Sequence, residues 1–164
     1  MAKRAINFFV LIILFMALPI AASGGSDEFK PGSEPDGFRG IKWGTDILTL
    51  RGMELIKDGG LEKYYKKRED NLTIGASHLS DITYVFRGGK FVTVIIRTKG
   101  DVNYGYLKDA CFEKFGKGWR TAADEKLDIQ SFAWFGDATW VSLKYEKVKD
   151  EGVLTFSQIP KGGC

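Results

Sequence analysis

The pair Gly88-Gly89 separates two stretches in which apolar residues largely alternate with polar ones. The stretches run from 81 to 87 and from 90 to 98, and alternation with a period of two is typical of β-strands. Because two glycines accept the positive φ angles of a tight turn, this segment predicts a β-hairpin. The centre of the chain is therefore committed to an antiparallel sheet, which limits the folds that the rest can adopt.

The register of this hairpin decides which side chains share a face. In a two-residue turn without irregularity, Phe86 faces Phe91, and their side of the hairpin is the better core face. The opposite side would then also carry apolar residues, namely Val85, Val92, Val94 and Ile96. The sequence thus predicts strands that are apolar on both faces.

Two helices are predicted. Asn103 can cap a helix that ends at Gly116, and its apolar residues recur at three- and four-residue spacing. These residues are Tyr104, Leu107, Cys111 and Phe115. Thr45 can cap a shorter helix over residues 46–51.

The other apolar segments favour strands joined by turns. Residues 61–68 and 72–77 predict one hairpin, and residues 129–135 and 138–146 predict another. Residues 153–159 predict a last strand. The chain between 119 and 128 is expected to be a loop, or a loop that ends in an edge strand.

The order of these elements predicts helix then strands, twice, over residues 38–99 and 101–159. We therefore expect an α+β fold, a single domain over 38–164 with an antiparallel sheet and helices on one of its faces.

The opposite face of the sheet would be open, and Trp140 would lie on it beside polar neighbours. A contiguous exposed apolar patch marks an interaction site. The patch that we expect to bind a partner comprises Val85, Val92, Val94, Ile96 and Trp140. The alternative is that the chain itself or a second subunit covers this face.

The N-terminal segment has the pattern of a secretory signal peptide. Lys3 and Arg4 precede an apolar run over 8–18, and small residues follow up to Ser23, where cleavage is expected. The run is too short for a stable membrane span, although an uncleaved anchor is the alternative. Residues 24–37 are rich in Gly, Pro and acids and predict a flexible leader. We expect a bacterial protein that is periplasmic or secreted.

The small number of cysteine and histidine residues limits which disulfide bonds and metal sites the chain can form. An exported chain enters an oxidising compartment, so Cys111 and Cys164 are candidates for a disulfide bond. The alternative is that Cys111 is simply a buried thiol, because it lies on the apolar stripe of its helix. One His and two Cys are too few for a structural zinc site made only of these residues, because such a site needs four ligands. No cofactor or phosphate-binding motif is present, and a net charge of +3 is too small to indicate nucleic acid.

The stretch Phe38-Arg39-Gly40-Ile41-Lys42-Trp43-Gly44 resembles the entry motif of a loose group of small exported bacterial proteins of unknown function. The pattern of helix and strands over 38–159 is similar to the outer-membrane assembly lipoprotein BamE and to the β-lactamase inhibitor protein. The lipid-bearing Cys of BamE-like proteins is lacking here. The resemblance implies at most a binding module.

The function expected from these features is non-enzymatic binding of a protein or an envelope component. No catalytic residue is assigned, because the single histidine, His78, lies in an extended segment whose neighbouring side chains point apart. The first alternative is an envelope hydrolase or ligand-binding enzyme with a carboxylate site. Its residues would come from Asp81, Asp124, Glu125 and Asp128. The second alternative is a structural homodimer.

Overall fold

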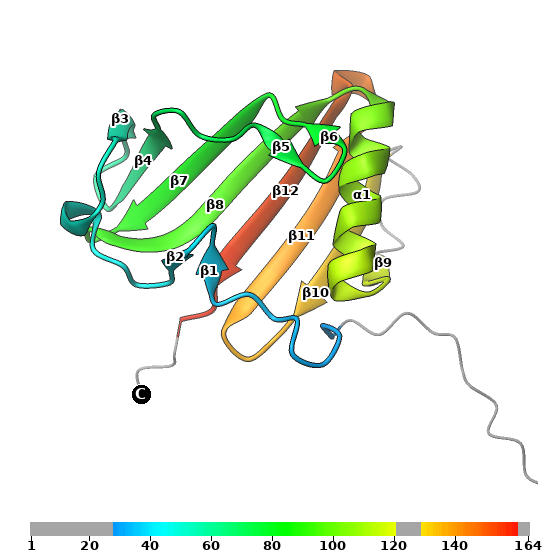
Figure 1. Ribbon diagram of the computed structural model, residues 1–164, viewed down its shortest axis with the longest axis horizontal. Coiled ribbons are helices and arrows are strands. Elements are labelled where there is room, and N and C mark those ends of the chain that lie inside the picture. Colours follow the sequence, from blue (N-terminus) through cyan, green and yellow to red (C-terminus); the bar gives the residue numbers. More distant parts are fainter. Residues whose placement is uncertain (1–27, 121–128, 161–164) are drawn as a thin grey trace, which may run out of the picture.

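The computed structural model describes residues 28–120 and 129–160. Its main element is one antiparallel sheet of eight strands (Figure 1). In spatial order the strands are β3 (Met53–Asp58), β4 (Glu62–Lys67), β7 (Asp81–Arg87), β8 (Lys90–Lys99), β12 (Glu151–Gln158), β11 (Thr139–Glu146), β10 (Ile129–Phe135) and β9 (Trp119–Arg120). Strands that neighbour one another along the chain mostly pair, and β12 also pairs with the distant β8, so it lies between β8 and β11.

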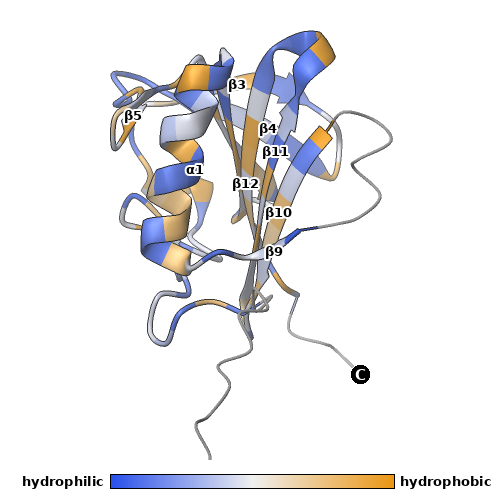
Figure 2. Ribbon diagram, turned by 90° about the vertical axis from the view of Figure 1, so that its right-hand side faces the viewer, coloured by the Kyte–Doolittle hydropathy of each residue, from blue (hydrophilic) through white to orange (hydrophobic). Residues whose placement is uncertain are grey.

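One helix, α1 (Asp101–Phe115), packs on one face of this sheet. Two short hairpins lie on the same face: β1 (Gly37–Phe38) with β2 (Ile41–Lys42), and β5 (Thr73–Ile74) with β6 (Ser77–His78). In the edge-on view α1 lies on one side of the sheet, and no described helix lies on the other (Figure 2). The core therefore forms between α1 and a single face of the sheet.

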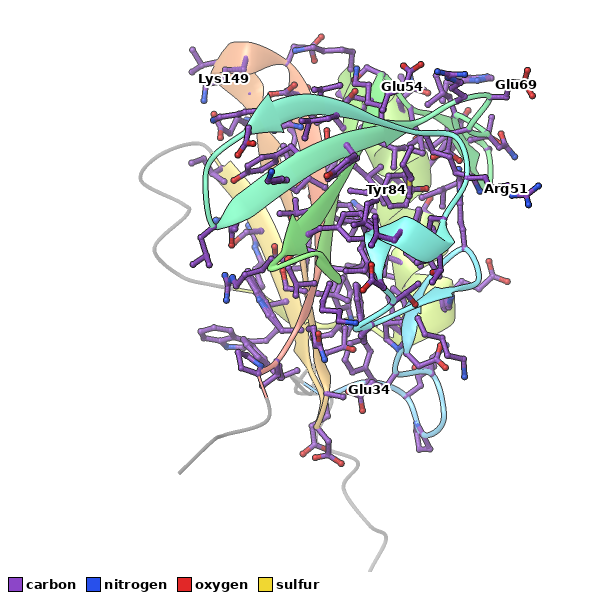
Figure 3. The ribbon with its side chains drawn as sticks, turned by 90° about the vertical axis from the view of Figure 1, so that its left-hand side faces the viewer. Glu34, Arg51, Glu54, Glu69, Tyr84 and Lys149 are labelled. Atoms are coloured by element: carbon purple, nitrogen blue, oxygen red, sulfur yellow. The ribbon has the colours of Figure 1, made fainter. Side chains whose placement is uncertain are left out.

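The core is rich in aromatic rings. Trp134 packs against Phe115 with ring centroids 5.8 Å apart, and its indole N–H donates to the Gly116 carbonyl at 2.9 Å. Tyr84 lies inside the molecule, and its hydroxyl donates to Asp70 Oδ2 at 2.7 Å (Figure 3). Asp70 also accepts a hydrogen bond from Arg39 at 2.6 Å. The buried hydroxyl of Tyr84 therefore has a charged partner, which offsets the cost of removing it from water.

The predicted hairpin over 81–99 is confirmed, but it contains a bulge. Phe86 pairs with Phe91 as expected, whereas Val85 pairs with Thr93 and leaves Val92 as the extra residue. An extra residue shifts every later side chain to the opposite face. Val94 and Ile96 are therefore turned into the core, where both are 0 % exposed. The expectation that these two residues lie on the open face was wrong.

The expected fold class, with two tandem units of helix and strands, was also wrong. The described chain is mostly β, with one α-helix and one eight-stranded sheet. Residues 46–51 form only a 3₁₀ turn over Ile47–Thr49, capped by Asp46, whose carboxylate accepts from the Leu48 N–H. This segment is too short to sustain an α-helix, since nucleation alone fixes several residues for one hydrogen bond. The chain then extends directly into β3, a strand that the sequence did not predict.

The hairpin predicted between 61–68 and 72–77 does not form. Strand β4 pairs instead with β3 and with β7. The second segment folds on itself, because Gly75 takes a positive φ of 55° between β5 and β6. By contrast, the hairpin of β10 and β11 is confirmed, with Phe135 opposite Trp140.

The long helix was predicted correctly, except at its first residues. It begins at Asp101, after Gly100, and Gly116 ends it with a φ of 94°. Asn103 is not its cap. Its side-chain oxygen accepts instead from the N–H of His78, which ties the β5–β6 hairpin to the helix.

Residues 28–37 were assigned to a flexible leader, but the structure shows them held against the domain. The Glu34 carboxylate accepts from the backbone N–H groups of Ala138 and Thr139 at 2.7 and 2.8 Å. Further along, the Trp43 indole N–H donates to the Thr139 hydroxyl at 2.7 Å. The predicted signal peptide, its predicted cleavage site at Ser23 and residues 24–27 lie outside the described residues. Within the described ranges, no helix has the length and apolarity needed to cross a membrane.

Candidate functional site

The candidate site is the face of the sheet opposite α1, which we call the open face. Strand register places its side chains in rows that cross the sheet. One row runs from the β10 edge through β11, β12, β8 and β7 to β4. Its residues are Phe135, Trp140, Ser157, Thr93, Val85 and Tyr64.

Aromatic side chains concentrate at the β9–β11 end of the open face. Phe135 lies opposite Trp140, and Trp119 lies opposite Ala133 on the neighbouring strand. Trp119 is 48 % exposed and Phe135 is 42 % exposed, while Trp140 is partly buried. Large aromatic rings seldom remain this accessible without a partner, and Trp is enriched in the energetic centres of interfaces.

Small and β-branched side chains form the middle of the open face. The next row holds Ala133, Ser142, Thr155, Ile95 and Thr83. Between the two rows, the hydroxyls of Thr93 and Ser157 lie 3.0 Å apart and form a hydrogen bond. These short side chains project little from the sheet and form the floor of the open face.

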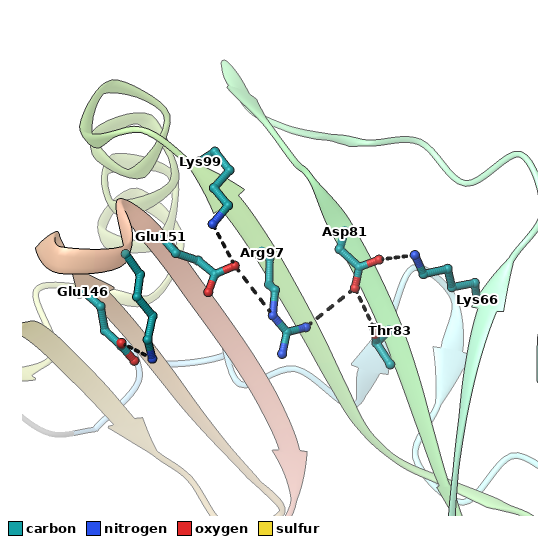
Figure 4. Close-up of polar contacts among 8 residues, drawn as sticks. Lys66, Asp81, Thr83, Arg97, Lys99, Glu146 and Glu151 are labelled. Atoms are coloured by element: carbon teal, nitrogen blue, oxygen red, sulfur yellow. Dashed lines mark hydrogen bonds and ion pairs between the residues drawn. The ribbon is translucent and has the colours of Figure 1, made fainter. Parts of the chain in front are cut away.

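A ladder of ion pairs closes the opposite end of the open face (Figure 4). Asp81 contacts Lys66 at 2.6 Å and Arg97 at 3.6 Å. Arg97 also lies 3.9 Å from Glu151, which in turn lies 3.4 Å from Lys99. The charges thus alternate across β4, β7, β8 and β12 and largely neutralise one another.

Asp81 is the ladder residue with the clearest electrostatic signature. Its partial burial alone would raise its pKa, but hydrogen bonds from Lys66 and Thr83 outweigh this and hold the pKa below its ordinary value. The Thr83 hydroxyl donates to Asp81 Oδ2 at 2.7 Å. Asp81 is therefore ionised at neutral pH, and it cannot act there as a general acid.

The structure places three of the five predicted patch residues on or beside the open face. Val85 and Trp140 follow from the register, and Val92 is the partly buried bulge residue. Val85 is only 3 % exposed, so it contributes little accessible surface to the open face. The other two, Val94 and Ile96, belong to the core.

Sequence reasoning missed Trp119, Phe135 and Ile95. Phe135 could have been found, because its offset from Trp140 across the Gly136 turn already puts it on the same face. Ile95 was missed because the bulge inverts its orientation. Trp119 falls in the segment predicted as a loop, or as a loop that ends in an edge strand, since a two-residue edge strand carries too little periodicity to detect.

The carboxylate site of the enzyme alternative is only partly within the described residues. Asp81 is bound in the ion-pair ladder, while Asp124, Glu125 and Asp128 lie outside the described ranges. His78 is exposed on β6, and its backbone N–H donates to the side-chain oxygen of Asn103. Across 28–120 and 129–160, no group of three or more metal-ligating side chains gathers.

Cys111 is a free thiol within the described chain, buried against the sheet on the inner side of α1. Burial raises the pKa of this thiol to about 12, so it is protonated and unreactive at neutral pH. Cys164 lies outside the described residues, and the bond between the two cysteines stays a prediction.

Comparisons with protein families, with curated proteins and with solved structures found no match to this chain. The open face is therefore interpreted from its own geometry alone.

Proposed function

We propose that this chain is an exported, non-enzymatic binding protein that engages a protein partner through the open face of its sheet. The observation that carries the proposal is a set of aromatic rings, with Trp119 and Phe135 exposed and Trp140 partly exposed, on a face that no described element covers. Protein interfaces are typically built around aromatic anchors and have a polar rim.

The size of the open face indicates what sort of complex it supports. Six strands about 4.8 Å apart, with three or four rows about 7 Å apart, give a surface of roughly 600–800 Å². A standard interface buries about 800 Å² on each partner, whereas an obligate homodimer buries about 1,000 Å² or more on each. The open face alone therefore suits a complex of standard size at most, which argues against an obligate homodimer as the main role.

Photo-crosslinking from the floor of the open face tests this function. A photoreactive amino acid in place of Ser157, between Trp140 and Thr93 in its row, should form an adduct with another protein in cells. The Trp140→Glu substitution should reduce this adduct at least about tenfold, since it removes an aromatic anchor and adds an unpaired charge.

The matched control is Leu48→Glu, which makes the same kind of change at a residue that is 90 % exposed on the 3₁₀ turn instead of the open face. This control should leave the adduct unchanged, and both variants should keep the wild-type urea midpoint. An adduct only with a second copy of the chain would favour the homodimer. Equal loss in both variants, or an adduct with glycan or lipid alone, would contradict a protein partner.

A further inference from the structure

A second feature lies on the opposite side of the sheet, beneath α1. A pocket of about 410 Å³ is bounded by α1, the β1–β2 hairpin and the start of β5, with β12 behind it. These elements can be followed in Figure 1. Pockets of 300 to 1,000 Å³ are the usual size for small-molecule sites, so the volume is sufficient for a ligand.

The inner part of this pocket is apolar. Its lining includes Phe38, Ile74, Cys111, Phe115, Leu154 and Phe156. Four of these residues are nearly fully buried, namely Cys111, Phe115, Leu154 and Phe156. Each of them therefore exposes only a small part of its surface at the base of the pocket. The thiol of Cys111 is protonated and adds no charge there. The base therefore suits a hydrocarbon chain.

The polar side chains that line the same pocket offer mainly hydrogen-bond donors. Arg39 uses one N–H group on Asp70 and one on the Thr73 carbonyl, and a guanidinium has five. The Asn71 side-chain oxygen accepts from the Thr73 hydroxyl, so the NH₂ group of Asn71 is the part that can donate to a ligand. Lys114 lies over the Phe115 ring at 5.3 Å and has no ion pair within the described chain.

The charge at this pocket is positive. The charge of Arg39 is offset by Asp70, but that of Lys114 is not, and no carboxylate side chain is part of the described lining. An apolar base beside a cation and free donors is complementary to an amphipathic anion.

From this arrangement we infer that the pocket beneath α1 binds a linear apolar chain with an anionic head group. At about 30 Å³ per non-hydrogen atom, the share of one water molecule in the liquid, the pocket holds roughly a dozen such atoms. A medium-length fatty acid has this size and charge. The head group lies near Lys114 and Asn71, and the chain extends over Ile74 toward Phe156.

Titration calorimetry of the purified protein with decanoate, below its micelle-forming concentration, tests this inference. Decanoate should bind saturably and shift the amide NMR signals of Ile74 and Phe115. Lys114→Gln should weaken decanoate at least about tenfold, because it removes the unpaired positive charge, yet leave the binding of uncharged decanol unchanged.

Lys108→Gln is the matched control, since it removes the same charge from the same helix at a residue that does not line the pocket. It should bind decanoate as the wild type does. A pocket-filling change, Ala110→Leu, should weaken both decanoate and decanol, and a Trp140→Glu variant should bind both normally.

A second arm distinguishes the source of the ligand. Vesicles containing phosphatidylglycerol test a membrane lipid, and decanoate tests a free fatty acid. If the vesicles or decanoate bind, and the Lys114→Gln substitution weakens that binding, the result supports the site and identifies the source of the ligand. Binding to neither, or equal affinity for decyltrimethylammonium, would overturn it.

Discussion

The two faces of the sheet use the same strands and differ in every other respect. On β8 and β12, Ile96 and Leu154 face α1 and are buried, whereas their neighbours Ile95 and Val153 face the open side and are partly exposed. The face under α1 gains its stability from buried apolar area. The open face keeps apolar groups in water, and this difference is the physical reason to treat one face as core and the other as a binding surface.

The strongest test of this difference compares two adjacent residues of the same type. Ile96→Ala should lower the free energy of unfolding by about 2–5 kcal/mol, because it opens a cavity in the core. Ile95→Ala should cost about 1 kcal/mol or less, since this side chain is partly exposed. Urea unfolding measures both. Similar losses in the two variants would show that the open face is covered as completely as the core.

A second test compares two buried tyrosines of the core, Tyr84 on β7 and Tyr104 on α1. The Tyr84 hydroxyl donates to Asp70, so Tyr84→Phe leaves a carboxylate short of one partner and should cost about 1–3 kcal/mol. The Tyr104 hydroxyl is buried with no hydrogen-bond partner within the described chain. Tyr104→Phe should therefore leave stability unchanged within about 0.5 kcal/mol or raise it. The opposite ranking in thermal unfolding would mean that the Tyr104 hydroxyl has a partner.

A third test concerns the ion-pair ladder of the open face. Asp81→Asn should cost about 1 kcal/mol at pH 7, because Lys66 and Arg97 lose their common partner at a partly exposed position. The pKa of Asp81 is lower in the folded chain than its usual value of 3.8. Its contribution is thus fully present above that value and is lost as the pH falls through the lowered folded-state pKa.

Unfolding measured from pH 7 down to about pH 2 should therefore show a constant gap between wild type and Asp81→Asn until about pH 4. The gap should then narrow. A gap that widens on acidification would show that the pKa of Asp81 is raised instead.

The sequence predicted the elements with strong local signals. The Gly88-Gly89 turn, the apolar stripe of α1 with its stop at Gly116, and the hairpin about Gly136 all depend on nearby residues, and each was found. The failures concern pairings between distant segments. Nothing local to residues 61–68 indicates that this strand pairs with β3 and β7 instead of the segment that follows it.

The sequence predicted that one face of the sheet is open, but it did not predict correctly which residues form that face. One extra residue at Val92 decides whether Ile95 or Ile96 faces outward, and a bulge of this kind is set by three-dimensional strain and not by periodicity. Trp140 was placed correctly because its hairpin is regular. The pocket beneath α1 could not be predicted, since it depends on how the β1–β2 hairpin and β5 are brought beside the helix.

The contacts of Glu34 and Trp43 with Thr139 have a consequence for how the chain acquires its structure. These contacts join residues about 100 positions apart, so the first ordered segment cannot reach its final place until β11 has been synthesised. Loop closure over such a distance makes docking of this segment a late event in folding. Until then the contacts at the Thr139 end of the core cannot form, and a chain shortened before residue 139 would lack them.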